Sequence, residues 1–175
     1  MNNSTGKTIS LTTLFRFTVS MIAMATTAFA LTASTRTDDE SAVRAALVEN
    51  AAGFERNDIA RVSKVWAQDE SVTVFESGHA NYGWADYRDH HLVPEMAELK
   101  NTKYALSNIK IRVAGDSAWA TFKYTISADL KERHVEGEGL GTAVLEKRAG
   151  RWLIVHWHSS SPRRTPADSP PPKKG

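Results

Sequence analysis

The sequence predicts an α+β fold in which a curved antiparallel sheet packs against about three helices from the first half of the folded region. Apolar residues recur at helical spacing in the early part of the folded region, and they alternate with polar residues, as in strands, over most of the region after residue 104. Such segregation is typical of domains whose helices cover one face of a sheet. Because long twisted strands backed by helices tend to curl, we expect a cone-shaped sheet in a single domain over residues 38–162.

Two helices are expected at the start of this domain. Thr37 or Asp38 is a good helix cap, and apolar residues then recur at helical spacing, at Val43, Leu47, Ala51 and Phe54. Asn57-Asp58 interrupts this stripe and provides a second cap. A shorter helix is expected next, with its stripe at Ile59, Val62, Val65 and Trp66.

A strand, a loop and a third helix should follow. Ser71–Glu76 alternates and places Val72, Val74 and Glu76 on one face. Gly78 and Gly83 bracket a loop that carries His79 and Tyr82. Trp84–Glu98 has helical character, and Pro94 should bend or end that helix.

The rest of the domain is predicted to be a meander of strands over residues 104–113, 117–129, 135–148 and 151–159, with tight turns at Gly115-Asp116 and Ala149-Gly150. Gly137, Gly139 and Gly141 recur at period two on one face. Glycine weakens a strand, so this ladder indicates tight curvature, room for a ligand, or space for a large neighbour such as Trp119 or Trp152.

Residues 1–30 have the features of a secretory signal peptide. Lys7 supplies a basic start, residues 17–31 are uncharged and apolar, and Ala28-Phe29-Ala30 is a cleavage pattern. The apolar stretch is shorter than the about 20 residues that a membrane span needs. We therefore expect cleavage, a periplasmic or secreted protein and no membrane anchor afterwards. Residues 163–175 are predicted to be a disordered, basic, Pro-rich tail.

The charge balance argues against a nucleic-acid partner. The chain has 22 Lys and Arg residues against 20 Asp and Glu. Two of the basic residues, Lys7 and Arg16, lie in the predicted signal, and four more lie in the tail. The predicted folded region is therefore slightly acidic, without the basic face that nucleic acids require. The chain has no cysteine, so disulfides cannot stabilise the exported domain.

Several motifs, taken in order, resemble the SnoaL-like branch of the nuclear transport factor 2-like superfamily. They are Phe54-Glu55-Arg56-Asn57-Asp58, Trp66-Ala67-Gln68-Asp69, Tyr82-Gly83-Trp84 and residues 150–159. The last run is similar to the end of the association domain of calcium/calmodulin-dependent kinase II. The resemblance implies a cystatin-like α+β barrel with a pocket between helices and sheet, and a homodimer formed across the outer face of the sheet.

The superfamily includes isomerases, cyclases and dehydratases of the ketosteroid-isomerase type, which transfer protons with a carboxylate. An ungapped match puts the carboxylate position of that type at Val74, and its tyrosine donor near Asn50. Glu76, two residues on and on the same strand face, is a weak candidate for the base. A solvated carboxylate at a strand end is the simpler interpretation of this residue.

Metal binding and carboxylate binding are two further possibilities for this chain. His156 and His158 point the same way on a strand and could share a metal, but no third ligand among His79, His90 and His91 stands at a diagnostic spacing. The arginines that meet carboxylates in the kinase association domain fall near Ala143 and Ser159 here, which leaves Arg88 as the nearest candidate. We therefore predict no metal and no cofactor.

An aromatic and imidazole set provides the best ligand-binding candidates, namely Trp66, Tyr82, Trp84, Tyr87, His91, Tyr124 and Trp157. Tyr82-Gly83-Trp84 is expected at the pocket mouth, whereas Trp66, Tyr124 and Trp157 should face the core. The sequence favours an exported domain that binds a small, mainly apolar molecule and self-associates. A proton-transfer enzyme is the alternative, and it requires Glu76 and a donor such as Tyr124 to converge on one cavity.

Overall fold

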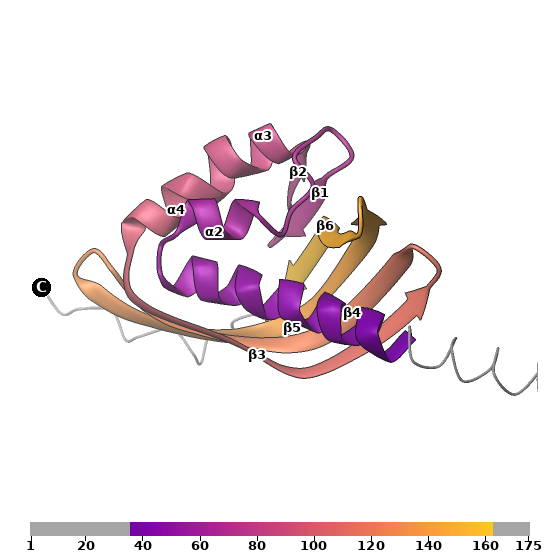
Figure 1. The fold of residues 1–175 in the computed structure, drawn as a ribbon. Coiled ribbons are helices and arrows are strands. Elements are labelled where there is room, and N and C mark those ends of the chain that lie inside the picture. The colour runs from indigo at the N-terminus through magenta and orange to yellow at the C-terminus, as the bar shows by residue number, and fades with distance from the viewer. Residues whose placement is uncertain (1–35, 163–175) are drawn as a thin grey trace, which may run out of the picture. The chain divides into compact units, whose positions relative to one another are not determined.

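A computed structural model describes residues 36–162 of the chain (Figure 1). The predicted signal peptide and the predicted C-terminal tail lie outside these residues. The compact unit that carries the fold begins at Glu40. Among the described residues, no helix is both long enough and apolar enough to cross a membrane.

Six strands form one curved sheet in the order β2-β1-β6-β5-β4-β3, and the sheet does not close (Figure 1). The strands are β1 (Thr73–Glu76), β2 (His79–Tyr82), β3 (Leu99–Ala114), β4 (Ser117–Leu130), β5 (Arg133–Arg148) and β6 (Arg151–Ser160). All neighbouring pairs are antiparallel except β1 and β6, which run parallel. The α+β class is confirmed, and the expectation of an antiparallel sheet holds away from the β1–β6 junction.

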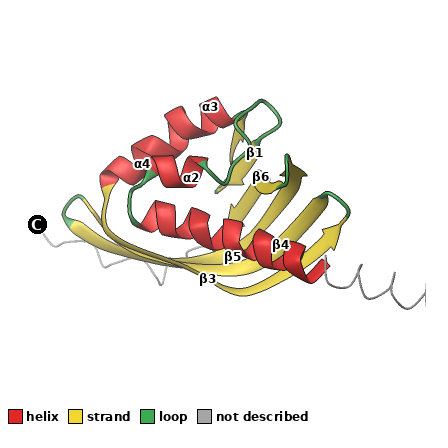
Figure 2. Ribbon diagram, viewed as in Figure 1, coloured by secondary structure: helices red, strands yellow, loops and turns green. Residues whose placement is uncertain are grey.

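The helices lie over one face of this sheet (Figure 2). The first helix is described over residues 36–55, and α2 (Ile59–Ser63) follows after a cap at Asp58, whose side chain accepts a hydrogen bond from the Arg61 amide. The third predicted helix is one continuous helical run made of α3 (Trp84–Tyr87), a π-helical segment η1 (Arg88–Leu92) and α4 (Val93–Glu98). The widened π segment ends two residues before Pro94, which has no backbone N–H to donate to the preceding turn.

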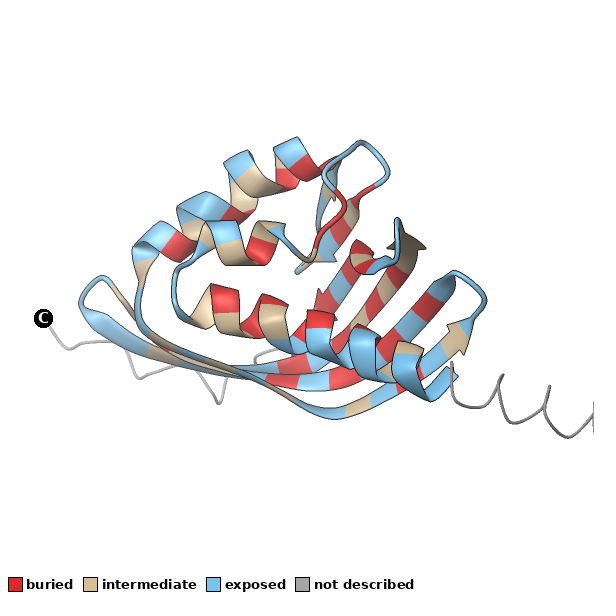
Figure 3. Cartoon of the chain, viewed as in Figure 1, coloured by how far each residue is buried: buried red, intermediate tan, exposed pale blue. Residues whose placement is uncertain are grey.

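The core lies between the helices and the inner face of the sheet, where buried and exposed residues alternate along the strands (Figure 3). On β4 the buried positions include Ala118, Ala120, Phe122 and Tyr124, as the period-two pattern predicts. Trp66 is 2% exposed and donates its indole N–H to the side-chain oxygen of Asn50 over 2.7 Å. This bond satisfies the polar group of the largest core residue.

Two predicted boundaries were wrong. Residues 79–82, expected in a loop, form β2 and pair with β1 in a hairpin whose turn at Gly78 has a φ of 84°. This four-residue strand has no buried position, so it carries no alternation signal. Strand β3 starts at Leu99 rather than Tyr104. The sequence does not show this start because two register shifts interrupt the alternation of the strand, and Asn101 and Asn108 adopt positive φ.

The glycine ladder on β5 makes room for aromatic rings from the neighbouring strand. A Cβ added to Gly141 would lie 2.1 Å from the Phe122 ring, and one added to Gly139 would lie 2.7 Å from the Tyr124 ring. The glycines therefore leave space for large side chains, as one of the three interpretations expected. The side chains that occupy this space are Phe122 and Tyr124 and not Trp119 or Trp152. The register explains this, since β4 and β5 place Phe122 opposite Gly141 and Tyr124 opposite Gly139.

The inward face of β6 changes partway along the strand. Trp152 and Ile154 are buried, and so are Trp157 and Ser159, although the two pairs differ in parity. The pairing with β5 skips Val155, which is the extra residue of a β-bulge. Because a bulge shifts the alternation by one residue, the sequence pattern alone could not assign one inward face to this strand.

Candidate functional site

A cavity of about 270 Å³ opens between the helices and the inner face of the sheet, at the end of β4 and β5 away from the β4–β3 turn at Gly115. Its acidic and basic lining consists of two carboxyls, Glu76 and Glu95, and two imidazoles, His79 and His91. Five aromatic rings complete much of the wall, from Phe54, Tyr87, Tyr104, Tyr124 and Trp157. The site therefore combines a polar cluster with an aromatic wall, as small-molecule sites do.

Four of the seven predicted ligand-binding residues line this cavity, namely Tyr87, His91, Tyr124 and Trp157. Trp66 packs behind the wall, with its ring 5.1 Å from that of Tyr87 and 5.5 Å from that of Trp84. Because they are enclosed by other rings, Trp66 and Trp84 belong to the core and do not reach the cavity.

The segment Tyr82-Gly83-Trp84 does not form the mouth that the sequence indicated. Trp84 is 3% exposed, and its indole N–H has no hydrogen-bond partner among the described residues. Tyr82 is 64% exposed on β2 and contacts Phe75 edge to face, away from the cavity lining. Tyr82 ends the unforeseen strand β2 and packs beside Phe75 of β1, whereas Trp84 begins α3 and is buried in the core.

Glu76 ends β1 and directs its carboxylate at the cavity. The Ser159 hydroxyl donates to Oε1 over 2.8 Å, and Oε2 lies 3.4 Å from Nε2 of His91. The side chain is 20% exposed. Glu76 is therefore not a carboxylate in open solvent, and it shares the cavity with Tyr124.

Hydrogen bonds orient the His91 ring. The side chain of Asn81 donates through Nδ2 to Asp86 over 3.0 Å, which assigns its Oδ1 as the atom 2.9 Å from His91 Nδ1. Because Oδ1 only accepts, Nδ1 carries the hydrogen and donates to it. The other ring nitrogen, Nε2, is the one that faces Glu76.

Glu95, which the sequence reading missed, lies one helical turn after His91. Burial raises the pKa of its carboxyl to about 7, and the negative charge of Glu76 contributes to the rise. The sequence could have indicated Glu95, because it lies four residues after His91 on a predicted helix and that spacing places both side chains on one helix face. Carboxyls titrating near neutrality are common at functional sites.

Three tyrosines, Tyr87, Tyr104 and Tyr124, form part of the cavity wall. The Tyr104 ring stacks against that of Tyr124 at 6.0 Å, and the Tyr124 hydroxyl lies 2.8 Å from that of Ser161. Burial, followed by the charge of Glu76, raises the pKa of both Tyr87 and Tyr104. These phenols therefore stay protonated and can donate hydrogen bonds to a ligand. Tyr104 was also missed, because it stands on an irregular strand.

Asn50, at the position where the resemblance places a tyrosine donor, lines the cavity and accepts the bond from Trp66. Its role is thus partly structural. The tyrosines of β3 and β4 supply the hydroxyls that this position lacks.

The two histidines of β6 do not join this cluster. Nδ1 of His156 lies 2.7 Å from the Thr73 hydroxyl, its ring packs against Phe75, and His158 is exposed. Only one group of described residues has the composition and spacing of a metal site, namely Glu76, His91 and Glu95, whose potential ligand atoms lie within 4.8 Å of one another. The expectation of a metal-free protein remains a prediction.

Comparison with known proteins identifies the class to which this fold belongs. The fold is that of the nuclear transport factor 2-like superfamily. A candidate dehydratase of that family from Streptomyces avermitilis aligns with a TM-score of 0.67 at 18% identity, over 73% of this chain and 99% of that one. A candidate calcium/calmodulin-dependent kinase II association domain from Xanthomonas campestris aligns with a TM-score of 0.57 at 23% identity, over 69% and 86%.

Within that superfamily, the chain belongs to the SnoaL-like domain family, whose model matches residues 43–164. A candidate ketosteroid isomerase from Shewanella frigidimarina is 28% identical, with a TM-score of 0.61 over 68% of this chain and 94% of that one. No curated protein matches the chain. The resemblance drawn from the motifs is therefore confirmed at the level of family and fold.

Proposed function

We propose that the cavity binds a small, mainly apolar molecule and transfers a proton within it, as an isomerase, cyclase or dehydratase would. One observation supports this most directly: Glu76 and Tyr124 line the same cavity. A proton-transfer site needs a base and a donor that reach one bound molecule. The similarity to a candidate ketosteroid isomerase and a candidate dehydratase agrees with this class of reaction.

Each group has a role in the proposed reaction. The Glu76 carboxylate removes a proton from a carbon atom of the ligand, and Ser159 holds that carboxylate through Oε1. His91, oriented by Asn81, receives or returns the proton through Nε2. The hydroxyl of Tyr124 donates a hydrogen bond to the oxygen on which negative charge develops.

Deuterium exchange into a small carbon acid tests this proposal without knowledge of the natural substrate. Phenylacetone is incubated with the protein in D₂O, and incorporation is followed by NMR. We expect catalysed exchange that falls by about a hundredfold in Glu76→Gln, because general-base catalysis contributes about that much or more. Glu138→Gln, an exposed carboxylate on β5, is the matched control and should exchange normally.

Two results would contradict the catalytic role. Exchange that is equal in Glu76→Gln and the unmodified protein rules out Glu76 as the base. Binding of phenylacetone with no catalysed exchange in either protein indicates a non-catalytic binding module of the same fold.

Export is part of the proposed function and follows from the N-terminal pattern of residues 1–30. Mass spectrometry of the protein secreted or released from the periplasm should give a chain that starts after Ala30. A chain that retains residues 1–30 in the soluble cell fraction would contradict this.

Self-association is proposed through the outer face of the sheet. Trp119 on β4 and Leu140 on β5 are 47% and 60% exposed, and both alternate with inward-facing residues. Exposed apolar groups of this size favour an interface. Light scattering should give a dimer that Trp119→Glu converts to a monomer, whereas Val93→Glu, at an exposed apolar position on α4, should leave it intact. A monomer in the unmodified protein would overturn the proposal.

A further inference from the structure

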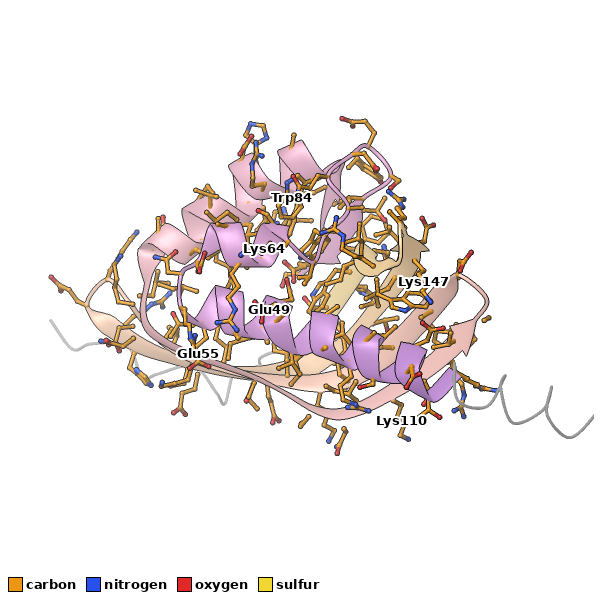
Figure 4. All side chains as sticks on the ribbon, viewed as in Figure 1. Glu49, Glu55, Lys64, Trp84, Lys110 and Lys147 are labelled. Carbon is orange, nitrogen blue, oxygen red and sulfur yellow. The ribbon has the colours of Figure 1, made fainter. Side chains whose placement is uncertain are left out.

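The charges around the cavity are unbalanced. Among the described residues, two carboxyls line it and no lysine or arginine does. The arginines on the surrounding helices are engaged elsewhere. Arg61 pairs with Glu49 at 2.5 Å between α2 and the first helix, where Figure 4 labels Glu49, and Arg88 pairs with Asp89 at 2.6 Å.

The two carboxyls differ in their hydrogen-bond and ion-pair partners. Glu76 has the Ser159 hydroxyl and the His91 ring. Within residues 36–162, Glu95 has no hydrogen bond and no ion pair, although it is partly buried. A carboxylate removed from water without a partner is costly, and the usual remedy is a positive charge or a retained proton. The raised pKa of Glu95 is consistent with a missing cation.

The wall facing these carboxyls suits an organic cation. Tyr87, Tyr104, Tyr124 and Trp157 provide electron-rich aromatic rings, which attract cations and also accept an apolar body. A volume of about 270 Å³ lies near the lower end of the range for ligand sites, so the molecule must be small. A ligand carboxylate would instead meet two carboxyl groups and no lysine or arginine.

We infer that the ligand of this cavity is a small amphipathic amine whose protonated nitrogen pairs with the carboxylate of Glu95. The aromatic wall takes its apolar part, and the Glu76–His91 pair is left to act on a neighbouring carbon. The inference rests on the proposed function only in using the same cavity. Its test measures binding without turnover, so the two can fail separately.

Three probes of similar size separate the charge classes: phenethylamine, 2-phenylethanol and phenylacetate. Isothermal titration at neutral pH should give a dissociation constant about tenfold or more lower for the amine than for the alcohol, and no detectable binding of phenylacetate. A tenfold preference corresponds to about 1.4 kcal/mol, which is within the range of a charge-assisted hydrogen bond. Each titration uses the mature full chain treated with EDTA.

Substitution of Glu95 assigns the preference to this residue. Glu95→Gln keeps the shape and removes the charge, so the amine and the alcohol should then bind about equally. Glu98→Gln, on the exposed side of the same helix, should retain the full preference. Circular dichroism of each variant verifies that the domain is folded.

Several results would overturn the inference. They are equal binding of amine and alcohol to the unmodified protein, binding of phenylacetate as tight as that of the amine, no binding of phenethylamine, or an unchanged preference in Glu95→Gln. A further arm titrates Zn²⁺ alone. If Zn²⁺ binds through Glu76, His91 and Glu95 and excludes phenethylamine, the cluster is a metal site and not an amine site.

Discussion

The inner face of the β4–β5 pair has two ends that share one sequence pattern and differ in packing. At the packed end, Ala118, Ala120, Ala143 and Leu145 are at most 1% exposed and belong to the hydrophobic core. At the open end, Tyr124 and Ile126 line the cavity and face polar groups from β1, η1 and α4. Both ends alternate at period two, so alternation marks the inner face of the sheet without distinguishing core from cavity.

The difference arises from the elements that cover each end. Small side chains at the packed end allow helices to approach closely and fill the space with apolar groups. At the open end the covering elements contribute Glu76, His91 and Glu95, which need solvent, a ligand or one another as partners. A cavity is the expected result where polar side chains from three elements face an aromatic wall.

The largest expected effect is a difference between the two ends in the free energy of unfolding that a truncated side chain costs. Leu145→Ala at the packed end should lower the free energy of unfolding by about 2–5 kcal/mol, because it removes fully buried methyl groups. Ile126→Ala at the open end should cost less, about 1 kcal/mol, since its side chain already borders a cavity. Urea unfolding of both variants measures this, and equal losses would remove the distinction.

A smaller effect is expected at the boundary between the two ends, where Gly141 lies under Phe122. The Cβ introduced by Gly141→Ala would be 2.1 Å from the ring, so the ring must move and the variant should lose about 1–3 kcal/mol. Gly137→Ala is the matched control, because its Cβ would be 3.2 Å from a methyl group of Ile126. Thermal unfolding that ranks Gly137→Ala as the more damaging change would contradict the assigned packing.

A third expected effect is a pH dependence confined to the open end. The folded-state pKa of Glu95, about 7, lies above its ordinary value of 4.5, so the folded state binds the proton more tightly. Stability should therefore fall as pH rises from 4.5 to about 7, and should level off above that. In urea titrations between these limits, Glu95→Gln should flatten this slope while Glu98→Gln retains it. A slope unchanged by Glu95→Gln would argue against this assignment.

Much of the fold was predictable because it is local. Apolar spacing on the helices, alternation on β4 and β5, and turns at Gly115 and Gly150 depend on neighbours within a few residues. The Asp58 cap is of the same kind. Predictions failed where the local pattern was weak or irregular, at β2 and at the start of β3, and the inward face of the last strand stayed unassigned because of the bulge at Val155.

The site was predictable only in part. Glu76, Tyr87, His91, Tyr124 and Trp157 were recognised by residue type and position, whereas Glu95 and Tyr104 were not. Glu76 and His91 are separated by fifteen positions, and the bond from Ser159 to Glu76 spans 83. No local pattern encodes such contacts.

By itself, the sequence determined the fold class, the order of the helices and strands other than β2, the inward face of each regular strand and the family. Only the tertiary structure decided that Glu76, His91 and Glu95 meet at the open end, and that Trp66, Tyr82 and Trp84 do not reach it. The physical reason is that periodicity arises from the geometry of one helix or strand. The site depends on strand register, on a bulge and on how separate elements pack together.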